Sequence, residues 1–236
     1  MASLSSSYSF AELCLYCFLR EMKKDLGSYR KSYDKDGLTE TALPANPKDL
    51  FQRWFQELET FGGLEEPNAM TIATIGLDGF PKSRVVLMKF ITEEGFIFFT
   101  NYNSEKGQAL AADPRICLSF YWPNMERQVI VKGKAEKVPP ALSDEYFASR
   151  PKGSKLGALA SDQSRVLASR AVLEEKLKNL EELYKDKPVD RPEHWGGYLV
   201  RPNSMEFWQG RPNRLHDRIR YVLHNDGKWN MERLAP

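Results

Sequence analysis

The sequence has few cysteines, no long apolar run and no excess of charge of either sign. Three cysteines in 236 residues are too few for a disulfide scaffold. No run reaches the ~18 apolar residues that a membrane span needs. The 34 basic and 32 acidic residues nearly cancel, which argues against a broad nucleic-acid surface. We therefore expect a cytoplasmic protein with no membrane or nucleic-acid partner.

Several catalytic signatures are also missing. There is no Walker-type or G-x-G-x-x-G loop, so the sequence does not support a nucleotide-triphosphate or Rossmann site. The three histidines, His194, His216 and His224, are scattered and have no acidic cluster beside them, so we expect no metal site. Cys14 and Cys17 form a lone C-x-x-C in an apolar stretch, which we interpret as packing or accident.

The hydrophobic period changes along the chain and predicts the fold. Asn46-Pro47 starts a helix with an apolar face that runs to Phe61. Alternation with short turns then predicts five strands, at Met70–Ile75, Ser83–Phe90, Phe96–Thr100, Arg115–Trp122 and Gln128–Val138. Further helical patterns cover residues 104–112, 141–160 and 169–185. Strands return at Trp195–Val200, from Met205 and from Arg218, followed by a last hairpin over 221–234.

Strands, then helices, then strands again, without βαβ alternation, favour an antiparallel β-barrel with helices packed outside it. The predicted class is mainly β with packed helices (α+β), antiparallel and Greek-key-like. We expect one domain over residues 29–236, preceded by a poorly ordered tail over residues 1–28.

Met205 to Arg218 is the most unusual stretch, because its turn carries more than turn residues. Trp208 lies next to a break that also holds Arg211, Arg214, His216 and Arg218. In an extended segment Arg214 and His216 would point the same way and suit a planar anionic ligand. A solvated basic loop is the alternative, and the pattern leaves both open.

Other polar residues occupy positions that a core or turn does not require. Arg84 and Lys89 point to opposite faces by strict alternation, so they serve one ligand only through strand twist, a bulge or two different anions. Lys106 lies in the first turn of a helix, where backbone N–H groups favour phosphate. Pro151 ends a helix near Arg150. The remaining candidates are Gln128, Tyr146, Ser154, Gln163 and Ser164. Two clusters of cation plus hydroxyl predict two phosphates, although each residue alone also fits a surface role.

Nine segments together resemble the pyridoxine (pyridoxamine) 5′-phosphate oxidase family. They are Arg84–Lys89, Phe99–Asn101, Glu126–Val129, Tyr146–Pro151, Gln163–Ser164, Trp195–Gly197, Glu206–Gly210, Arg214–Arg218 and Glu232–Pro236. The resemblance runs from about Arg30 to the C-terminus. It implies an FMN-binding split β-barrel that forms a homodimer with FMN at the interface. It also implies oxidation of pyridoxine or pyridoxamine 5′-phosphate to pyridoxal 5′-phosphate, with O2 as acceptor and H2O2 as product.

The resemblance also assigns roles to positions in this chain. The implied FMN contacts are Arg84, Val85, Val86, Leu87, Met88, Lys89, Phe99, Thr100, Lys106, Gln128, Gln163, Ser164, Trp208 and Arg218. The implied substrate contacts are Arg30, Lys31, Ser32, Tyr33, Lys89, Tyr146, Arg150, Ser154, Arg214, Leu215 and His216. Of these, Arg214 and His216 are the implied catalytic pair, and residues 30–33 are implied to close over the substrate.

One position departs from the family. An arginine usually precedes the lysine at position 106, and here the residue is Glu105. A carboxylate beside a phosphate repels it, so weaker FMN binding or an outward-turned Glu105 is expected. Two alternatives remain: a flavin-binding protein with another substrate or no activity, and a module that binds pyridoxal phosphate without turnover.

Overall fold

The computed structural model describes residues 26–236. Contacts divide the chain into two compact units, residues 1–33 and 34–236. In the first unit residues 26–33 form neither helix nor strand, and Arg30 donates a hydrogen bond to the carbonyl of Gly27 at 2.9 Å. Cys14, Cys17 and most of the predicted tail lie outside the described residues.

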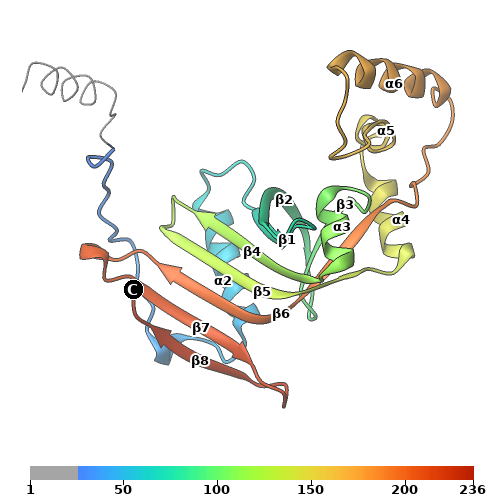
Figure 1. Cartoon of the computed structure of the whole chain (residues 1–236). Helices are drawn as coiled ribbons and strands as arrows, with labels where there is room; N and C mark the ends of the chain where they lie inside the picture. Colours follow the sequence, from blue (N-terminus) through green and yellow to red (C-terminus); the bar gives the residue numbers. More distant parts are fainter. Residues whose placement is uncertain (1–25) are drawn as a thin grey trace, which may run out of the picture. The chain divides into compact units, whose positions relative to one another are not determined.

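Six antiparallel strands close into a barrel in the second unit (Figure 1). In sheet order they are β3 (Phe96–Asn101), β2 (Pro81–Ile91), β1 (Ala69–Ile75), β4 (Arg115–Trp122), β5 (Arg127–Lys137) and β6 (Trp195–Gln209), and pairing of β3 with β6 closes the ring. Strands β7 (Asp217–Leu223) and β8 (Trp229–Leu234) extend the sheet beyond β6. The predicted barrel is confirmed.

Strand β6 is long enough to join two parts of the sheet. Its first half pairs with β3 and its second half with β7, while β5 runs beside it. The prediction of two separate strands, at Trp195–Val200 and from Met205, was wrong because Pro202 lies at a register shift rather than a strand end. A bulge tolerates a residue without an N–H. Gly133 faces this bulge, where an added Cβ would lie 2.2 Å from the carbonyl oxygen of Arg201.

The barrel core is filled from helix α2 (Pro47–Phe61) and the inner faces of the strands. Asn46 caps the helix by accepting a hydrogen bond from the Lys48 N–H at 3.1 Å. Phe51 and Trp54 on its buried face pack against aromatic rings of the sheet, including Phe207. Each such side chain contributes roughly 1.5–3 kcal/mol by burial. The predicted helix and its apolar face are confirmed.

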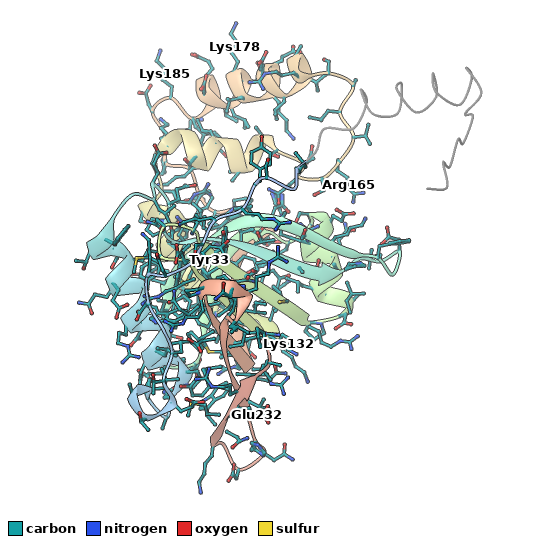
Figure 2. All side chains as sticks on the ribbon, turned by 90° about the vertical axis from the view of Figure 1, so that its left-hand side faces the viewer. Tyr33, Lys132, Arg165, Lys178, Lys185 and Glu232 are labelled. Carbon is teal, nitrogen blue, oxygen red and sulfur yellow. The ribbon has the colours of Figure 1, made fainter. Side chains whose placement is uncertain are left out.

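The remaining helices are α3 (Glu105–Ala112), α4 (Pro140–Ser149), α5 (Lys152–Ala160) and α6 (Arg170–Leu183). The helical pattern predicted over 141–160 breaks between Arg150 and Pro151, as the proline indicated. A second apolar cluster, built around Phe147 and Trp195, joins α4, α5 and the start of β6. Lys178 and Lys185 point outward from the α6 side (Figure 2). In the described part of the chain no helix combines the length and apolar character that crossing a membrane requires.

Candidate active site

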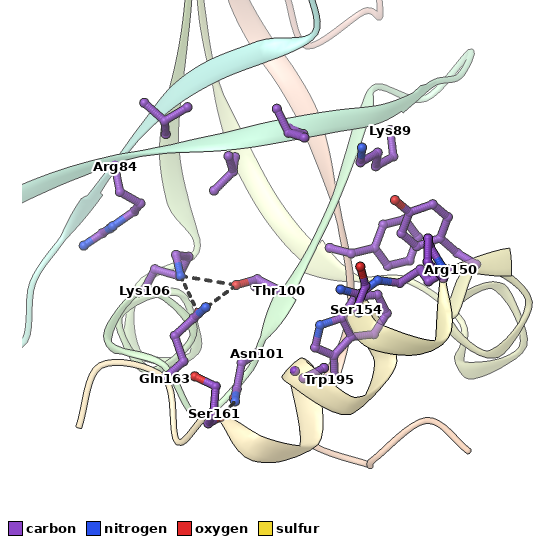
Figure 3. A pocket seen from close by; sticks show the side chains of 18 residues that line it. Arg84, Lys89, Thr100, Asn101, Lys106, Arg150, Ser154, Ser161, Gln163 and Trp195 are labelled. Atoms are coloured by element: carbon purple, nitrogen blue, oxygen red, sulfur yellow. Dashed lines mark hydrogen bonds between the residues drawn. The ribbon is translucent and has the colours of Figure 1, made fainter. Parts of the chain in front are cut away.

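A cavity of about 670 Å³ lies between the barrel wall and the helices α3, α4 and α5 (Figure 3). Its lining contains four cationic side chains, three aromatic rings and several hydroxyl and amide groups. The predicted site residues that line it are Arg84, Val85, Val86, Leu87, Lys89, Phe99, Thr100, Lys106, Tyr146, Arg150, Ser154 and Gln163. The fold thus gathers both predicted cation clusters around one cavity.

A bulge in β2 explains how Arg84 and Lys89 reach the same cavity. Met88 pairs with Phe98 and Phe90 pairs with Ile97, so Lys89 is the extra residue between them. A bulge re-aims a side chain that alternation would place on the opposite face. The side chain of Met88 is buried in the core and does not line the cavity. The bulge thus brings both side chains to one cavity, and because they lie at its opposite ends (Figure 3) the alternative of two different anions stays open.

Lys106 occupies one end of the cavity, in the first turn of α3. Its ammonium donates to Gln163 Oε1 at 2.8 Å, to Thr100 Oγ1 at 3.3 Å and to Ser104 Oγ at 3.4 Å. All three partners are neutral. The pKa of Lys106 is lowered to about 8, chiefly by burial and then by the charge of Arg84, while the charge of Glu105 opposes both effects. A buried ammonium without a counter-ion in contact suits an anionic ligand.

Arg84 reaches the same end of the cavity from β2. Its Nη1 donates to Thr74 Oγ1 at 3.0 Å and to the carbonyl of Lys82 at 3.3 Å. Its Nη2 lies 3.6 Å from Glu105 Oε2. Glu105 is itself ion-paired with Lys82 and does not line the cavity. The carboxylate of Glu105 thus lies behind Arg84, outside the lining of the cavity, and its effect on FMN binding stays a prediction.

Arg150 occupies the other end of the cavity, near Lys89 and Ser154 (Figure 3). Its guanidinium carbon lies 4.6 Å from the centre of the Trp195 ring. Among the described residues its buried Nη1 has no hydrogen-bond partner, and no carboxylate lies within ion-pair distance. Burial lowers the pKa of Arg150. An unsatisfied guanidinium at a cavity wall is suited to an anion that accepts its hydrogen bonds.

Aromatic rings stack along the wall between helix α4 and the barrel. The rings of Phe99 and Tyr146 are 4.0 Å apart, and those of Phe99 and Trp195 are 5.5 Å apart with an interplanar angle of 13°. Trp195 escaped the sequence prediction because a tryptophan opening a strand resembles a packing residue. The Trp195-Gly-Gly197 segment in the resemblance was the signal that could have identified it.

Gln128, Trp208 and Arg218 do not line this cavity in their own chain. They form a row across the sheet, because Gln128 on β5 pairs with Trp208 on β6, which pairs with Arg218 on β7. The residues next to them in the chain, Val129, Phe207 and Ile219, are fully buried in the core. Because side chains alternate along a strand, the row lies on the face of the sheet that points away from the core. Arg218 is held by Glu206 at 2.8 Å.

The loop between β6 and β7 carries Arg214 and His216. Arg214 ends the 3₁₀ turn η2 (Pro212–Arg214), is exposed and has a φ of 61°. The assumption of an extended segment was therefore wrong, because Pro212 and the left-handed Asn213 turn the chain there. His216 accepts a hydrogen bond at Nδ1 from the backbone N–H of Arg211 at 3.1 Å, and its ring lies 4.7 Å from that of Trp208.

The remaining predicted residues are more peripheral. Leu215 is exposed in the same loop. Ser164 follows Gln163 but is exposed and does not line the cavity. Arg30, Lys31, Ser32 and Tyr33 belong to the first compact unit.

Comparisons with known proteins identify the family of the chain. The family model described as pyridoxamine 5′-phosphate oxidase matches residues 56–184. The chain belongs to the pyridoxamine 5′-phosphate oxidase family. The model of the pyridoxine 5′-phosphate oxidase C-terminal dimerisation region matches residues 195–236. That second match contains the row on β5 to β7 only in part, but it contains the whole Arg214–His216 loop.

Named relatives place the chain among the oxidoreductases of this family. A pyridoxine/pyridoxamine 5′-phosphate oxidase of Flavobacterium psychrophilum is 63% identical over 213 residues, 90% of this chain and 100% of the relative. One of Pseudomonas paraeruginosa is 51% identical over 216 residues, 91% of this chain and 100% of the relative. The crystal structure of PhzG from Burkholderia lata, bound to tetrahydrophenazine-1-carboxylic acid, has a TM-score of 0.79 at 30% identity, covering 85% of this chain and 98% of that one.

Proposed function

We propose that this enzyme oxidises pyridoxine 5′-phosphate or pyridoxamine 5′-phosphate to pyridoxal 5′-phosphate, with FMN as cofactor and O2 as acceptor. The observation that carries the proposal is a single cavity with a separate anion site at each end. Cofactor and substrate each bring one phosphate, so a member of this family needs two such sites. A single-phosphate ligand would leave one end unexplained.

The residues present fit FMN at the Arg84–Lys106 end. Among the described residues Lys106 is buried with neutral hydrogen-bond partners, and the first turn of α3 would add backbone N–H groups. Each charge-assisted hydrogen bond contributes roughly 1.5–3 kcal/mol. FMN held there would supply a hydride acceptor for C4′ of the vitamer and a route for the electrons to O2, giving H2O2; with the amine, water would then hydrolyse the imine and release ammonia.

The Arg150 end fits the phosphate of the vitamer. The unsatisfied Nη1 of Arg150, the ammonium of Lys89 and the hydroxyls of Tyr146 and Ser154 are donors around the same space. Hydrogen bonds from this group fix the position of the phosphate, and with it the distance of C4′ from the cofactor. Such orientation is the main contribution that a protein makes to hydride transfer.

A second copy of the chain would supply the remaining groups. Gln128, Trp208 and Arg218 form a row outside the cavity, and Arg214 is exposed. The match of residues 195–236 to a dimerisation region supports a homodimer. We propose that FMN lies at the dimer interface and that Arg214 of one chain covers the pyridine ring held by the other. His216 would orient or deprotonate the C4′ substituent.

An absorbance scan and a peroxide assay test the reaction. The purified protein should be yellow and should release H2O2 with pyridoxine or pyridoxamine 5′-phosphate, but not with unphosphorylated pyridoxine at the same concentration. A yellow protein without turnover would favour a flavoprotein with another substrate. A colourless protein that binds pyridoxal phosphate would favour a binding module.

Subunit complementation tests the shared site. Arg150→Ala and Arg214→Ala each remove one side of the proposed site, so at a substrate concentration well below the wild-type KM each variant alone should retain about a tenth of the activity or less. After the two are mixed and allowed to exchange subunits, half of the dimers carry one intact site. Activity should then recover to roughly one quarter of wild type. No recovery, despite proven exchange, would place both residues in a site within one chain.

A further inference from the structure

Two charged residues beside the Arg84–Lys106 end do not line the cavity and have no role so far. Glu105 opens helix α3, and Lys82 lies on β2 two residues before Arg84. Lys82 forms an ion pair with Glu105 and another with Asp78 at 3.1 Å. The Glu105 carboxylate, followed by that of Asp78, raises the pKa of Lys82. The side chains of Lys82 and Glu105 are about half exposed or less, at 32% and 45%.

These residues form a line of alternating charge that ends in the cavity. It runs from Lys82 to Glu105 and then to Arg84, whose Nη2 is 3.6 Å from the carboxylate. An anion held by Arg84 and Lys106 therefore experiences a negative charge immediately behind its cationic contacts. Because the carboxylate lies only 3.6 Å from Arg84 Nη2, its charge and the charge of the anion repel each other even in a partly hydrated site. Lys82 supplies the opposite charge on the far side of that carboxylate.

The position of Arg84 does not depend on Glu105 alone. Its Nη1 is fixed by the Thr74 hydroxyl and by the Lys82 carbonyl, which is a backbone group. Removing the charge of Glu105, or the ammonium of Lys82, leaves both of these hydrogen bonds in place. Substitutions at the two positions therefore change the field at the anion site more than its geometry.

We propose that Lys82 and Glu105 set the phosphate affinity of the Arg84–Lys106 end from outside the cavity, with Glu105 weakening anion binding and Lys82 restoring it. A change of charge at either position would therefore alter cofactor affinity while the groups that line the cavity stay the same. The identification of the anion as the phosphate of FMN rests on the proposed function. The charge arrangement itself does not.

Flavin titration of the full chain, stripped of bound flavin, tests this pair. Glu105→Gln should tighten FMN binding about three- to tenfold, and Lys82→Met should weaken it by a similar factor, because the charges are partly exposed and screened. The double variant should return close to wild type, since it removes one charge of each sign. Asp78→Asn is the matched control and should have a smaller effect, because Asp78 contacts Lys82 but not Arg84.

Riboflavin separates an electrostatic effect from a structural one. It carries the same ring without the phosphate, so its affinity should be equal in all four variants and in wild type. The differences in FMN affinity should also shrink as the salt concentration rises. Parallel changes for FMN and riboflavin, or weaker FMN binding by Glu105→Gln, would overturn the proposal.

A different result would count against the proposed function instead. If the wild-type chain binds no flavin, FMN is not its cofactor. The same variants can then be titrated with inorganic phosphate and followed by thermal unfolding. The same order of affinities, with Glu105→Gln tightest and Lys82→Met weakest, would support the charge pair, and equal affinities would overturn it.

Discussion

The cavity and the C-terminal strands hold their cationic side chains in opposite ways. Among the described residues, Lys89, Lys106 and Arg150 at the cavity have no carboxylate within ion-pair distance, and only Arg84 has one, at 3.6 Å. In the C-terminal region every arginine that follows β6, except Arg214, is paired with a carboxylate of the described chain; these are Arg211, Arg218, Arg220 and Arg233. Cations held by hydroxyl, amide and ring contacts keep their charge available for a ligand. Cations paired with carboxylates fix the chain instead.

Asp217 joins several of the ion pairs and hydrogen bonds in the C-terminal region. Its Oδ2 accepts a hydrogen bond from the Leu38 N–H at 3.0 Å, and its Oδ1 accepts one from Arg233 at 2.7 Å. Arg233 also pairs with Glu40 and lowers the pKa of that carboxyl to about 2. These contacts tie residues 38–40 to the loop that carries Arg214 and His216. Arg214 itself is exposed and has no carboxylate within ion-pair distance in the described part of the chain.

Arg214 therefore offers the strongest test of the contrast, because it is the C-terminal arginine left without a carboxylate. Arg214→Ala should lower kcat by about 10²-fold through lost orientation of the substrate, while FMN remains bound. Steady-state kinetics and the flavin content of the purified variant measure the two effects. Arg220→Ala, on β7 and paired with Glu232, is the control and should leave kcat near wild type. Loss of FMN in step with kcat would place Arg214 at the cofactor instead.

Arg150 tests those cations of the cavity that have no carboxylate partner among the described residues. Arg150→Ala should raise the KM for pyridoxine 5′-phosphate by about 10- to 100-fold, because one or more charge-assisted hydrogen bonds to the phosphate are lost. The affinity for FMN should be unchanged. Arg170→Ala, exposed on α6 and paired with Glu174, is the matched control. An unchanged KM for the Arg150 variant would remove the substrate phosphate from this end of the cavity.

Asp217 tests whether the paired cations stabilise the fold. Asp217→Ala removes the acceptor of two hydrogen bonds and should lower the free energy of unfolding by about 1–3 kcal/mol. For a chain of this size the midpoint of thermal unfolding should fall by roughly 2–12 °C. Asp226→Ala, in the exposed β7–β8 turn, should change the free energy of unfolding by less than about 0.5 kcal/mol. Equal midpoints for the two variants would contradict the structural role.

The smallest expected effect is the pH dependence at Lys106. Its pKa is lowered to about 8 chiefly by burial, so the free protein loses this charge as the pH rises through that value. Binding of a phosphate dianion favours the charged form, and FMN affinity should fall by about three- to tenfold between pH 7 and pH 9. Lys106→Arg should flatten the profile, since a guanidinium stays protonated. A flat profile in wild type would show that this ammonium does not contact the phosphate.

The same residue affects stability in the opposite direction. The folded pKa of Lys106, about 8, lies below the value of 10.5 for an unfolded lysine. The unfolded chain therefore binds more protons between these values, and the cofactor-free protein gains stability as the pH rises from 8 to 10.5. Bound FMN should oppose this trend because it favours the charged ammonium. Thermal unfolding with and without FMN across this range measures both effects.

Local patterns predicted the elements well where one residue type decides the backbone. Asn46-Pro47 marked the start of α2, Pro151 marked the break between α4 and α5, and the period of two predicted most strands of the barrel. The pattern failed at Pro202, which interrupts the alternation without ending β6. It failed again at Arg214, where a left-handed turn replaces an extended segment. In both places the conformation depends on neighbouring strands.

The sequence by itself determined the antiparallel barrel, the packing helices and the types of side chain at the candidate site, because alternation, caps and prolines act through neighbours in the chain. Tertiary structure alone decided which of those side chains share a space. The bulge at Lys89 turned it toward the cavity with Arg84, and the pairing of β5, β6 and β7 placed Gln128, Trp208 and Arg218 elsewhere. The physical reason is that strand register and bulges are set by contacts between segments far apart in the sequence, and one residue of shift moves a side chain to the other face.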